Sequence, residues 1–437
     1  MQSPTTQHHA DLPTGSERLL KAAREVIPGG VNSGRRNTAS KLCVRSAHGA
    51  YFEDIDGRRY TDYHAAYGPI VLGHSHPTVI ERVTEAIRDT VLFGLGVTEA
   101  ELELARKIVH HVPSVEQVLI CNSGSEATYH ALRAARAVTG RQMTLRFASL
   151  YHGYHDAVLA SAGGLATAQA ETLVCRYNDL ESVREAVARH PEQIAALIVE
   201  PVVHNAPGGS ILPVPGFLEG LREICDREGI ALIFDEVITG FRHGLGGYQA
   251  ICGVSPDLTT LGKAIANGFS LAAVGGKRSV MERFNTHPDG DVFYGGTYNG
   301  NAPVVAAALA TIEVMEREPV HQHIFALGDR MRTGLTKVAE AAGVPACAGG
   351  FGSLFVLSFL DGEIRNHEDV ARNDTELFLA YRRQLVRRGS FEVPENVGRS
   401  HIGYSHTEQD IDRSLSIAEE ALAAALEERA HASSHTS

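Results

Sequence analysis

The feature that most constrains this chain is a regular alternation of short apolar runs and amphipathic stretches across its middle. Seven apolar runs have the length and composition of buried strands: Val118–Cys121, Met143–Phe147, Leu173–Arg176, Ala196–Val199, Ala231–Phe234, Leu258–Leu261 and Leu271–Gly275. Several stretches between them, such as Glu126–Thr139, Leu180–Arg189 and Gly216–Glu228, have the apolar spacing of helices. Strands that alternate with helices predict an α/β fold with a mostly parallel seven-stranded sheet covered on both faces.

The two ends of the chain predict a second, smaller α/β domain beside the large one. Asp56-Gly57 is a hairpin turn signal, a long helix begins at Pro303, a short strand lies near 353–360, and a final helix starts at Thr407 with a capping-box pattern. We therefore divide the chain into five segments: a disordered tail over 1–15, small-domain parts over 16–65 and 306–429, the large domain over 66–305, and a second tail over 430–437.

Composition excludes several classes of function. The 437 residues include 40 basic and 52 acidic side chains, a net charge of −12, and an acidic chain without a basic run binds nucleic acid poorly. No stretch approaches the roughly 18 consecutive apolar residues of a membrane span, and the N-terminus lacks the pattern of a signal peptide. None of the six cysteines pair as CxxC, so we expect reduced thiols, no metal site and a cytoplasmic protein.

Residues that carry chemistry follow several of the predicted strands, and ligands in such sheets bind at the carboxyl ends of the strands. Ser123, Gly124 and Ser125 follow the first strand and open a helix, where free N–H groups and hydroxyls make either an anion site or an ordinary helix cap. Tyr151 and His152 follow the second strand, and the aromatic ring there either lies against a planar cofactor or packs in the core.

Three charged side chains complete this set. Glu200 follows a strand as a candidate site residue, although a Glu-Pro pair also simply ends a strand. Asp235 ends a strongly apolar strand and needs a partner, which is either a ligand or a structural ion pair. Lys263 lies 28 residues after Asp235, one helix and one strand later, between apolar and glycine neighbours.

Together these residues predict pyridoxal 5′-phosphate (PLP) as the cofactor. A lysine amine forms a Schiff base with an aldehyde, and the phosphate needs an anion site. The ring needs an aromatic face, and its nitrogen needs a carboxylate to stay protonated. The lysine, once released by the substrate, is free to act as general base and acid.

At this point the chain resembles the class-III, fold-type I, PLP-dependent aminotransferases over roughly residues 16–429. The segments that carry the resemblance are Asn122-Ser-Gly-Ser-Glu-Ala127, Tyr151-His-Gly153, Glu200-Pro201, Phe234-Asp-Glu-Val-Ile-Thr-Gly-Phe-Arg242, Pro256-Asp-Leu-Thr-Thr-Leu-Gly-Lys263 and Gly295-Gly-Thr297.

The resemblance implies a role for each matching residue. Lys263 is the Schiff-base lysine, Asp235 the partner of the pyridine nitrogen, and Val237 and Tyr151 pack on opposite faces of the ring. The phosphate is held by Ser123, Gly124 and Ser125, and by Gly296-Thr297 from the neighbouring subunit of a homodimer. Glu200 and His152 lie near the hydroxyl side of the ring.

Within this family the chain is most similar to the glutamate-1-semialdehyde 2,1-aminomutases, whose N-terminal substrate segment matches Ile27–Ser33. Arg36 falls where those enzymes bind a substrate carboxylate; the alternative is a surface arginine. Three features depart from the aminomutase pattern: a shortened gating loop over 156–178, Gly398 beside Arg399 in place of an active-site glutamate, and Tyr67 in place of a tryptophan. Extra residues at 206–210 also alter the wall of the site. We assign Ser33, Arg36, Tyr67 and Arg399 to the substrate.

These observations favour an aminotransferase that moves an amino group from an amine or amino-acid donor to a carbonyl acceptor, through a Lys263 Schiff base and a ketimine. The alternative function is a true aminomutase. The shortened loop favours the aminotransferase, because it would let the intermediate of an aminomutase escape. A substrate with a carboxylate, such as a β-amino acid, fits Arg36, because β-amino-acid aminotransferases share the short loop and an N-terminal arginine. A PLP-binding regulator would need a DNA-binding extension that the segment before Ser16 is too short to hold.

Overall fold

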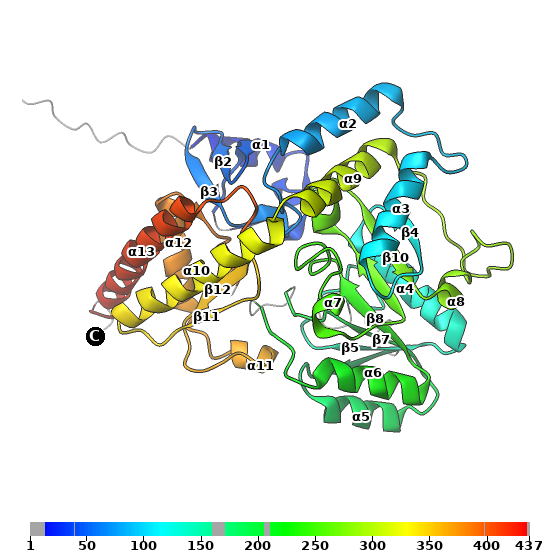
Figure 1. Ribbon diagram of the computed structural model, residues 1–437. Helices are drawn as coiled ribbons and strands as arrows, with labels where there is room; N and C mark the ends of the chain where they lie inside the picture. The colour runs from blue at the N-terminus through cyan, green and yellow to red at the C-terminus, as the bar shows by residue number, and fades with distance from the viewer. Residues whose placement is uncertain (1–13, 39, 160–170, 205–209, 397, 435–437) are drawn as a thin grey trace, which may run out of the picture.

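The computed structural model describes residues 14–38, 40–159, 171–204, 210–396 and 398–434, and it has the predicted α/β fold (Figure 1). Its central sheet has seven strands in the order β4-β10-β9-β8-β7-β5-β6. The strands are β4 Gln117–Cys121, β5 Met143–Phe147, β6 Thr172–Cys175, β7 Ile194–Val199, β8 Ala231–Glu236, β9 Leu258–Leu261 and β10 Ala272–Gly276. Only β10 runs antiparallel to its neighbours, which confirms the mostly parallel sheet.

Helices cover both faces of this sheet because successive side chains of a strand point to opposite faces. On β7, Ala196 and Ile198 join a core cluster with α4, whereas Leu197 and Val199 join a cluster with α5 and α6. The helices of the large domain are α2 Pro77–Asp89, α3 Glu99–His111, α4 Gly124–Thr139, α5 Leu180–Arg189, α6 Phe217–Glu228, α7 Gln249–Cys252, α8 Arg278–Met281 and α9 Ala302–Arg317.

The two chain ends together build the smaller unit, as the sequence predicted for the fold. One sheet has the order β1-β2-β3-β13 and a second has the order β11-β12-β14, so N-terminal and C-terminal strands pair directly. The strands are β1 Val44–His48, β2 Tyr51–Asp54, β3 Arg59–Asp62, β11 Cys347–Gly349, β12 Leu354–Ser358, β13 Ser390–Phe391 and β14 Ser400–His401. The hairpin of β2 and β3 turns at the predicted Asp56-Gly57, where Gly57 has a φ of +83°.

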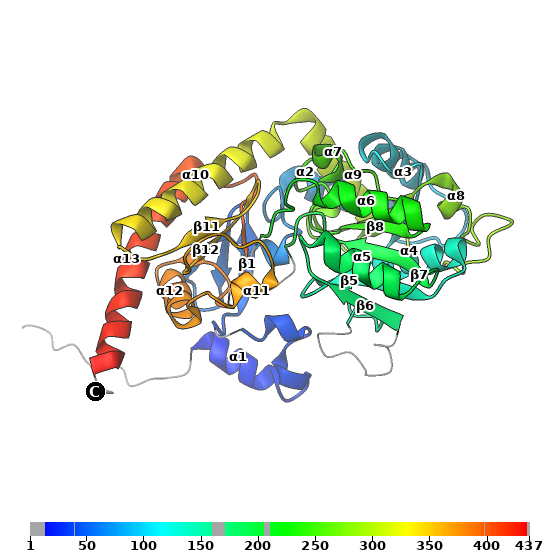
Figure 2. The same cartoon turned by 90° about the horizontal axis from the view of Figure 1, so that it is seen from below.

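Helices α10 Val320–Ala341, α11 His367–Val370, α12 Thr375–Arg387 and α13 Glu408–Ser434 complete the small unit, and α1 Gly15–Ala23 lies at its edge (Figure 2). The long helix expected from Pro303 onward is two helices, because Pro319 disfavours the helical conformation of Glu318 before it. Thr407 and Asp410 form the predicted capping box of α13. This helix runs past the expected boundary at 429, whereas residues 1–13 of the expected N-terminal tail lie outside the described residues.

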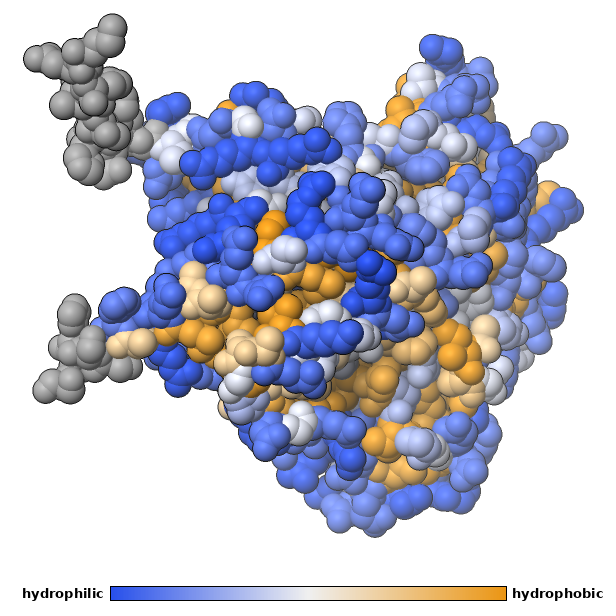
Figure 3. Space-filling model, turned by 60° about the vertical axis from the view of Figure 1, so that its left-hand side comes forward, coloured by the Kyte–Doolittle hydropathy of each residue, from blue (hydrophilic) through white to orange (hydrophobic). Residues whose placement is uncertain are grey.

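The side of the molecule that carries the C-terminal end shows an apolar band surrounded by hydrophilic residues (Figure 3). Among the described residues, no helix is both long and apolar enough to cross a bilayer. All six cysteines are free.

A fully buried arginine, Arg242, connects the large and small units. Arg242 follows β8, is fully buried, and donates hydrogen bonds to the carbonyl oxygens of Gly68 (2.6 Å), Ile70 (3.1 Å) and Ile402 (3.3 Å). It also donates to the Ser353 hydroxyl at 3.1 Å. Burial, with repulsion from a neighbouring arginine, lowers the pKa of its guanidinium to about 9. Three segments that are far apart in sequence therefore meet at one side chain.

We expect Arg242→Met to lower the free energy of unfolding by about 3 kcal/mol, because it leaves buried oxygen acceptors without donors. Urea denaturation measures this loss. The matched control is Arg330→Met, which breaks an exposed ion pair with Asp412 and should leave the free energy of unfolding nearly unchanged. Equal losses in the two variants would contradict a special role for Arg242.

Candidate active site

The carboxyl ends of the parallel strands surround one cavity of about 290 Å³. Its wall brings together most of the residues that the sequence singled out, although they come from four different strands. The lining residues are Pro69, Asn122, Ser123, Gly124, Ser125, Tyr151, His152, Gly153, Asp235, Val237, Lys263, Gly268, Phe269, Ser270 and Leu271.

The N-terminus of α4 forms one end of the cavity. Ser123 is the cap residue, and its hydroxyl accepts a hydrogen bond from the backbone of Glu126 at 3.2 Å. The other N–H groups of this first turn have no partner within the helix, and the helix dipole makes this end electropositive. The Asn122-to-Ser125 segment is therefore a helix cap, and its remaining N–H groups suit an anion, so the two interpretations of its sequence are compatible.

Two glycines are required here by close packing. A side chain at Gly124 would come within 2.8 Å of Val237, which follows β8 and lines the cavity. A side chain at Gly153 would come within 2.8 Å of the Ser125 hydroxyl, and Gly153 has a φ of +113°. These glycines let the segments that follow β4, β5 and β8 approach one another around the cavity.

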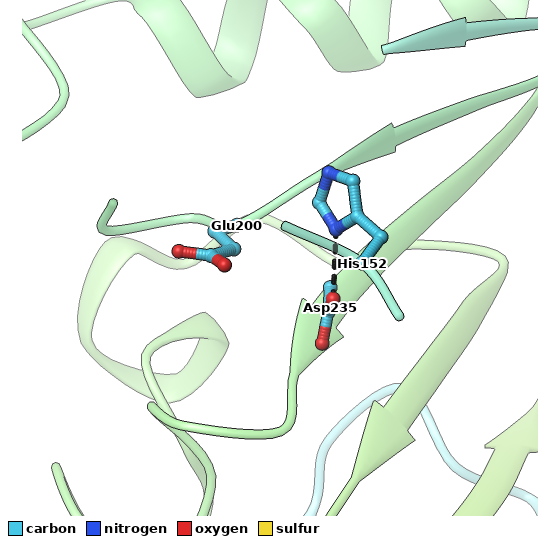
Figure 4. Close-up of side chains that lie close together, drawn as sticks. All are labelled: His152, Glu200 and Asp235. Carbon is cyan, nitrogen blue, oxygen red and sulfur yellow. Dashed lines mark hydrogen bonds and ion pairs between the residues drawn. The ribbon is translucent and has the colours of Figure 1, made fainter. Parts of the chain in front are cut away.

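Asp235 is a buried carboxylate that three neighbouring groups hold in place. It is 3% exposed, and its carboxylate accepts from the backbone N–H of Val237 (3.1 Å) and the Thr260 hydroxyl (3.1 Å). The His152 ring contacts the other oxygen at 2.7 Å through Nδ1 (Figure 4). Thr260 is a residue that the sequence interpretation missed, since its place beside Asp235 follows from the register of β8 and β9.

Glu200 lies beside this pair at the end of β7, buried to 2% exposure. His152, Glu200 and Asp235 each offer one atom that can bind a metal. These three atoms lie within 4.8 Å of one another, a spacing that also suits a metal ion (Figure 4). The sequence predicts a cofactor ring here and no metal. His152 Nε2 is buried and makes no hydrogen bond within the described part of the chain.

Lys263 begins a short 3-10 helix directly after β9 and lines the cavity. Its φ of +46° is unusual for a residue with a side chain, and such conformations concentrate at functional sites. Burial lowers the pKa of its amine from 10.5 to about 8, and repulsion from Arg399 adds to this shift. Asp235 and Glu200 oppose the shift. A larger fraction of the amine is therefore in the neutral, nucleophilic form near neutral pH.

Arg399, which the sequence assigned to the substrate, lies partly buried close to this amine. Its guanidinium donates to the carbonyl oxygen of His204, to that of Tyr67 (3.5 Å) and to His401 Nε2 (3.3 Å). Burial lowers its pKa to about 10, and the Glu200 carboxylate opposes that shift. At that pKa the group remains a cation at neutral pH.

The N-terminal segment places an unexpected arginine at the site. The Arg35 guanidinium carbon lies 5.5 Å from the centre of the Tyr151 ring, and the Tyr67 hydroxyl donates to the Arg35 carbonyl oxygen. Arg36 and Ser33, the residues that the sequence selected, lie on the same turn, and all three side chains are exposed. Within a one-turn helix, neighbouring side chains point in different directions, so residue spacing alone does not identify the arginine that faces the cavity.

Gly296 and Thr297 do not line the cavity of their own chain. Both are exposed in the loop that precedes α9. This loop is joined to the site by a 2.8 Å hydrogen bond from the Asn122 amide to Asn299.

Two predicted features fall on residues outside the described ranges. They are the centre of the shortened loop, at 160–170, and most of the extra residues at 206–210.

Comparison with known proteins gives consistent matches over nearly the whole chain. The family model described as aminotransferase class-III matches residues 32–384. A protein from Syntrophomonas wolfei named glutamate-1-semialdehyde 2,1-aminomutase is 41% identical over 93% of this chain and 97% of its own. A crystal structure described as a novel β-phenylalanine aminotransferase from Variovorax paradoxus is 32% identical, covers 93% of both chains and has a TM-score of 0.85. A structure described as a transaminase with PLP bound is 29% identical, covers 94% of this chain and 98% of its own, and has a TM-score of 0.86.

We expect the lowered pKa of Lys263 to be visible in its reactivity. In the cofactor-free protein, the rate of acylation of Lys263 by acetic anhydride should rise with pH around a midpoint of about 8, because only the neutral amine reacts. Arg399→Met removes a repelling charge and should move the midpoint upward. Mass spectrometry of the labelled peptide measures both. A midpoint near 10.5 in the unaltered chain would contradict the shift.

Proposed function

Because the chain belongs to the class-III aminotransferase family, we propose that it uses PLP to move an amino group from an amine or amino-acid donor to a carbonyl acceptor. We further propose that the substrate carries a carboxylate, with a β-amino acid as one candidate. The observation that carries the proposal is a single cavity that holds a lysine of lowered pKa, a buried carboxylate and a helix N-terminus.

The cavity fits PLP at three separate points. The N-terminus of α4, with Ser123 and Ser125, suits the phosphate. Asp235 suits the ring nitrogen, since its carboxylate is already fixed by neighbouring donors. Gly124 leaves room for Val237 against the helix, so that Val237 and Tyr151 are available to pack on the ring. When bound, PLP supplies an aldehyde that condenses with amines and a ring that withdraws electrons.

The residues of this chain then have distinct tasks. The Asp235 carboxylate keeps a proton on the ring nitrogen, and the His152 and Thr260 contacts hold Asp235 in place. With the cofactor bound, the neutral amine of Lys263 would be placed to take the proton from the substrate carbon as general base and to give it back as general acid. The donor leaves as a carbonyl compound and the acceptor leaves as an amine, so the two halves of the reaction balance without an external oxidant.

The carboxylate of the substrate has a suitable partner in Arg399. A buried guanidinium offers a planar pair of donors to a carboxylate, and such pairs are stronger where water is excluded. Arg399 is close enough to Lys263 to lower the pKa of its amine, so a carboxylate bound at Arg399 lies near the reacting carbon. Arg35, above Tyr151, adds a second positive charge to the same region.

The second candidate function is a glutamate-1-semialdehyde aminomutase. The relative at 41% identity that carries this name favours it. Tyr67, Gly398 and the shorter 156–178 loop favour the aminotransferase, because an aminomutase must retain its intermediate and an open site releases it.

We propose a homodimer as the working form. Val91, Phe93, Leu95 and Val97 are more than half exposed, and the loop that holds them lies on the same side of the molecule as the 293–300 loop (Figure 1). Exposed apolar residues gathered in this way mark interfaces. We infer that a second copy covers this surface and that Thr297 reaches the cavity of that copy.

We also propose that the protein works in the cytoplasm. The six free cysteines fit a reducing compartment, and several of them are buried.

The proposed reaction is tested with purified protein and a panel of amine donors and keto acids. We expect the absorbance of the bound cofactor to change with a donor alone and to recover when a keto acid is added. Lys263→Ala is the control: it should keep the fold and lose turnover. Efficient conversion of glutamate-1-semialdehyde without a co-substrate would replace this proposal with the aminomutase.

The dimer is tested by mixing two variants that are each inactive alone. If Thr297 acts in the partner's site, a hybrid of Thr297→Asp and Lys263→Ala subunits has one intact site. Random exchange should then restore activity to about a quarter of the sites. In the control, the two variants are mixed only briefly in the cold, so that their subunits do not exchange, and no activity should return. No recovery after full exchange, verified by mass spectrometry, would place Thr297 in its own site or outside both.

A further inference from the structure

A buried ion pair in the small unit lies directly beside the substrate arginine. Arg382, on α12, has a side chain that is 0% exposed and donates to the carboxylate of Glu392, which is 6% exposed and follows β13. The guanidinium also lies over the Phe378 ring, with its carbon 4.9 Å from the ring centre.

This pair holds the chain on both sides of Arg399. Arg382 Nη2 donates to the Gly398 carbonyl oxygen at 2.8 Å, and Nη1 donates to the Ser400 hydroxyl at 3.0 Å. The Ser400 hydroxyl in turn donates to Glu392 Oε2 at 2.6 Å. The residue before Arg399 and the residue after it are therefore both fixed by the same ion pair.

Stability alone does not account for an ion pair at this place. The loss of hydration on burying two charges is about as large as their attraction, so apolar residues of similar volume are often as stabilising. What a hydrogen-bonded pair supplies, and an apolar pair does not, is a fixed position for the polar groups that it contacts. Here those groups are the peptide carbonyl and the hydroxyl that flank Arg399.

We propose that Arg382 and Glu392 are positioning residues that orient Arg399 toward the carboxylate of the substrate. The inference rests on the proposed carboxylate-binding role of Arg399, and it assigns to the small unit a task in substrate selection. A guanidinium binds a carboxylate through two parallel bonds, so a small displacement of its backbone weakens both bonds. The effect is confined to substrates that have a carboxylate.

The test compares a carboxylate-bearing donor from the panel with the same amine lacking the carboxylate, such as β-phenylalanine and 1-phenylethylamine. The main variant is Arg382→Met with Glu392→Leu, which removes both charges and leaves none unpaired. We expect KM for the carboxylate donor to rise about tenfold or more. KM for the simple amine and both kcat values should change less than twofold.

A second measurement does not depend on the substrate. Displacement of Arg399 relieves its repulsion of Lys263. The pH midpoint for acylation of Lys263 should therefore move upward in the double variant, in the same direction as expected for Arg399→Met. Ser400→Ala keeps the ion pair and should give a smaller change in the same direction. Arg429→Met, which breaks an exposed pair with Asp374 in the same unit, is the control and should change neither value.

The outcomes separate the inference from the function on which it rests. If Arg399→Met weakens both substrates equally, the carboxylate role of Arg399 is wrong and the positioning role falls with it. If Arg399→Met is selective but the folded double variant leaves KM and the Lys263 midpoint unchanged, the positioning role alone is overturned. A loss of the same size for both substrates in the double variant also overturns it.

Discussion

The position of the whole site depends on the hydrogen bonds of Arg242. Its guanidinium donates to oxygens of the N-terminal segment and of the small unit, while its backbone belongs to the loop that follows β8. Asp235 is the penultimate residue of that same strand. A buried cation among backbone carbonyls tolerates little displacement, because each lost bond leaves a polar group without water. The cofactor face of the sheet and the substrate-facing segments are thus held in one arrangement.

The electrostatic character of the site follows from this arrangement. Lys263, Arg399 and Arg35 bring positive charge to a region that Asp235 and Glu200 only partly balance, and partial burial strengthens the repulsion between Lys263 and Arg399. Burial together with this repulsion leaves about half of the lysine amine neutral at pH 8, and the positive charge favours anionic ligands. One physical cause, positive charge concentrated away from water, therefore serves both nucleophile activation and the binding of a carboxylate.

Much of the site was predictable because strand order along the chain fixes which residues end at the same edge of a parallel sheet. Ser123, Tyr151, Asp235 and Lys263 each follow an apolar run, and parallel pairing brings them to one cavity. Thr260 was not predictable, since its contact with Asp235 depends on the register between two strands. Arg382 was equally hidden, because a charged residue on a helix gives no sign in the sequence that it is buried.

The sequence by itself determined the α/β fold, the family and most of the residues that line the cavity, because these depend on apolar periodicity and on short segments whose chemistry is local. Only the tertiary structure decided that Arg35 rather than Arg36 contacts Tyr151, and that Arg382 and Glu392 hold the two sides of Arg399. It also decided that Thr297 lies exposed, away from the cavity of its own chain. Side-chain direction and contacts between distant segments are set by packing, and packing depends on all of the chain at once.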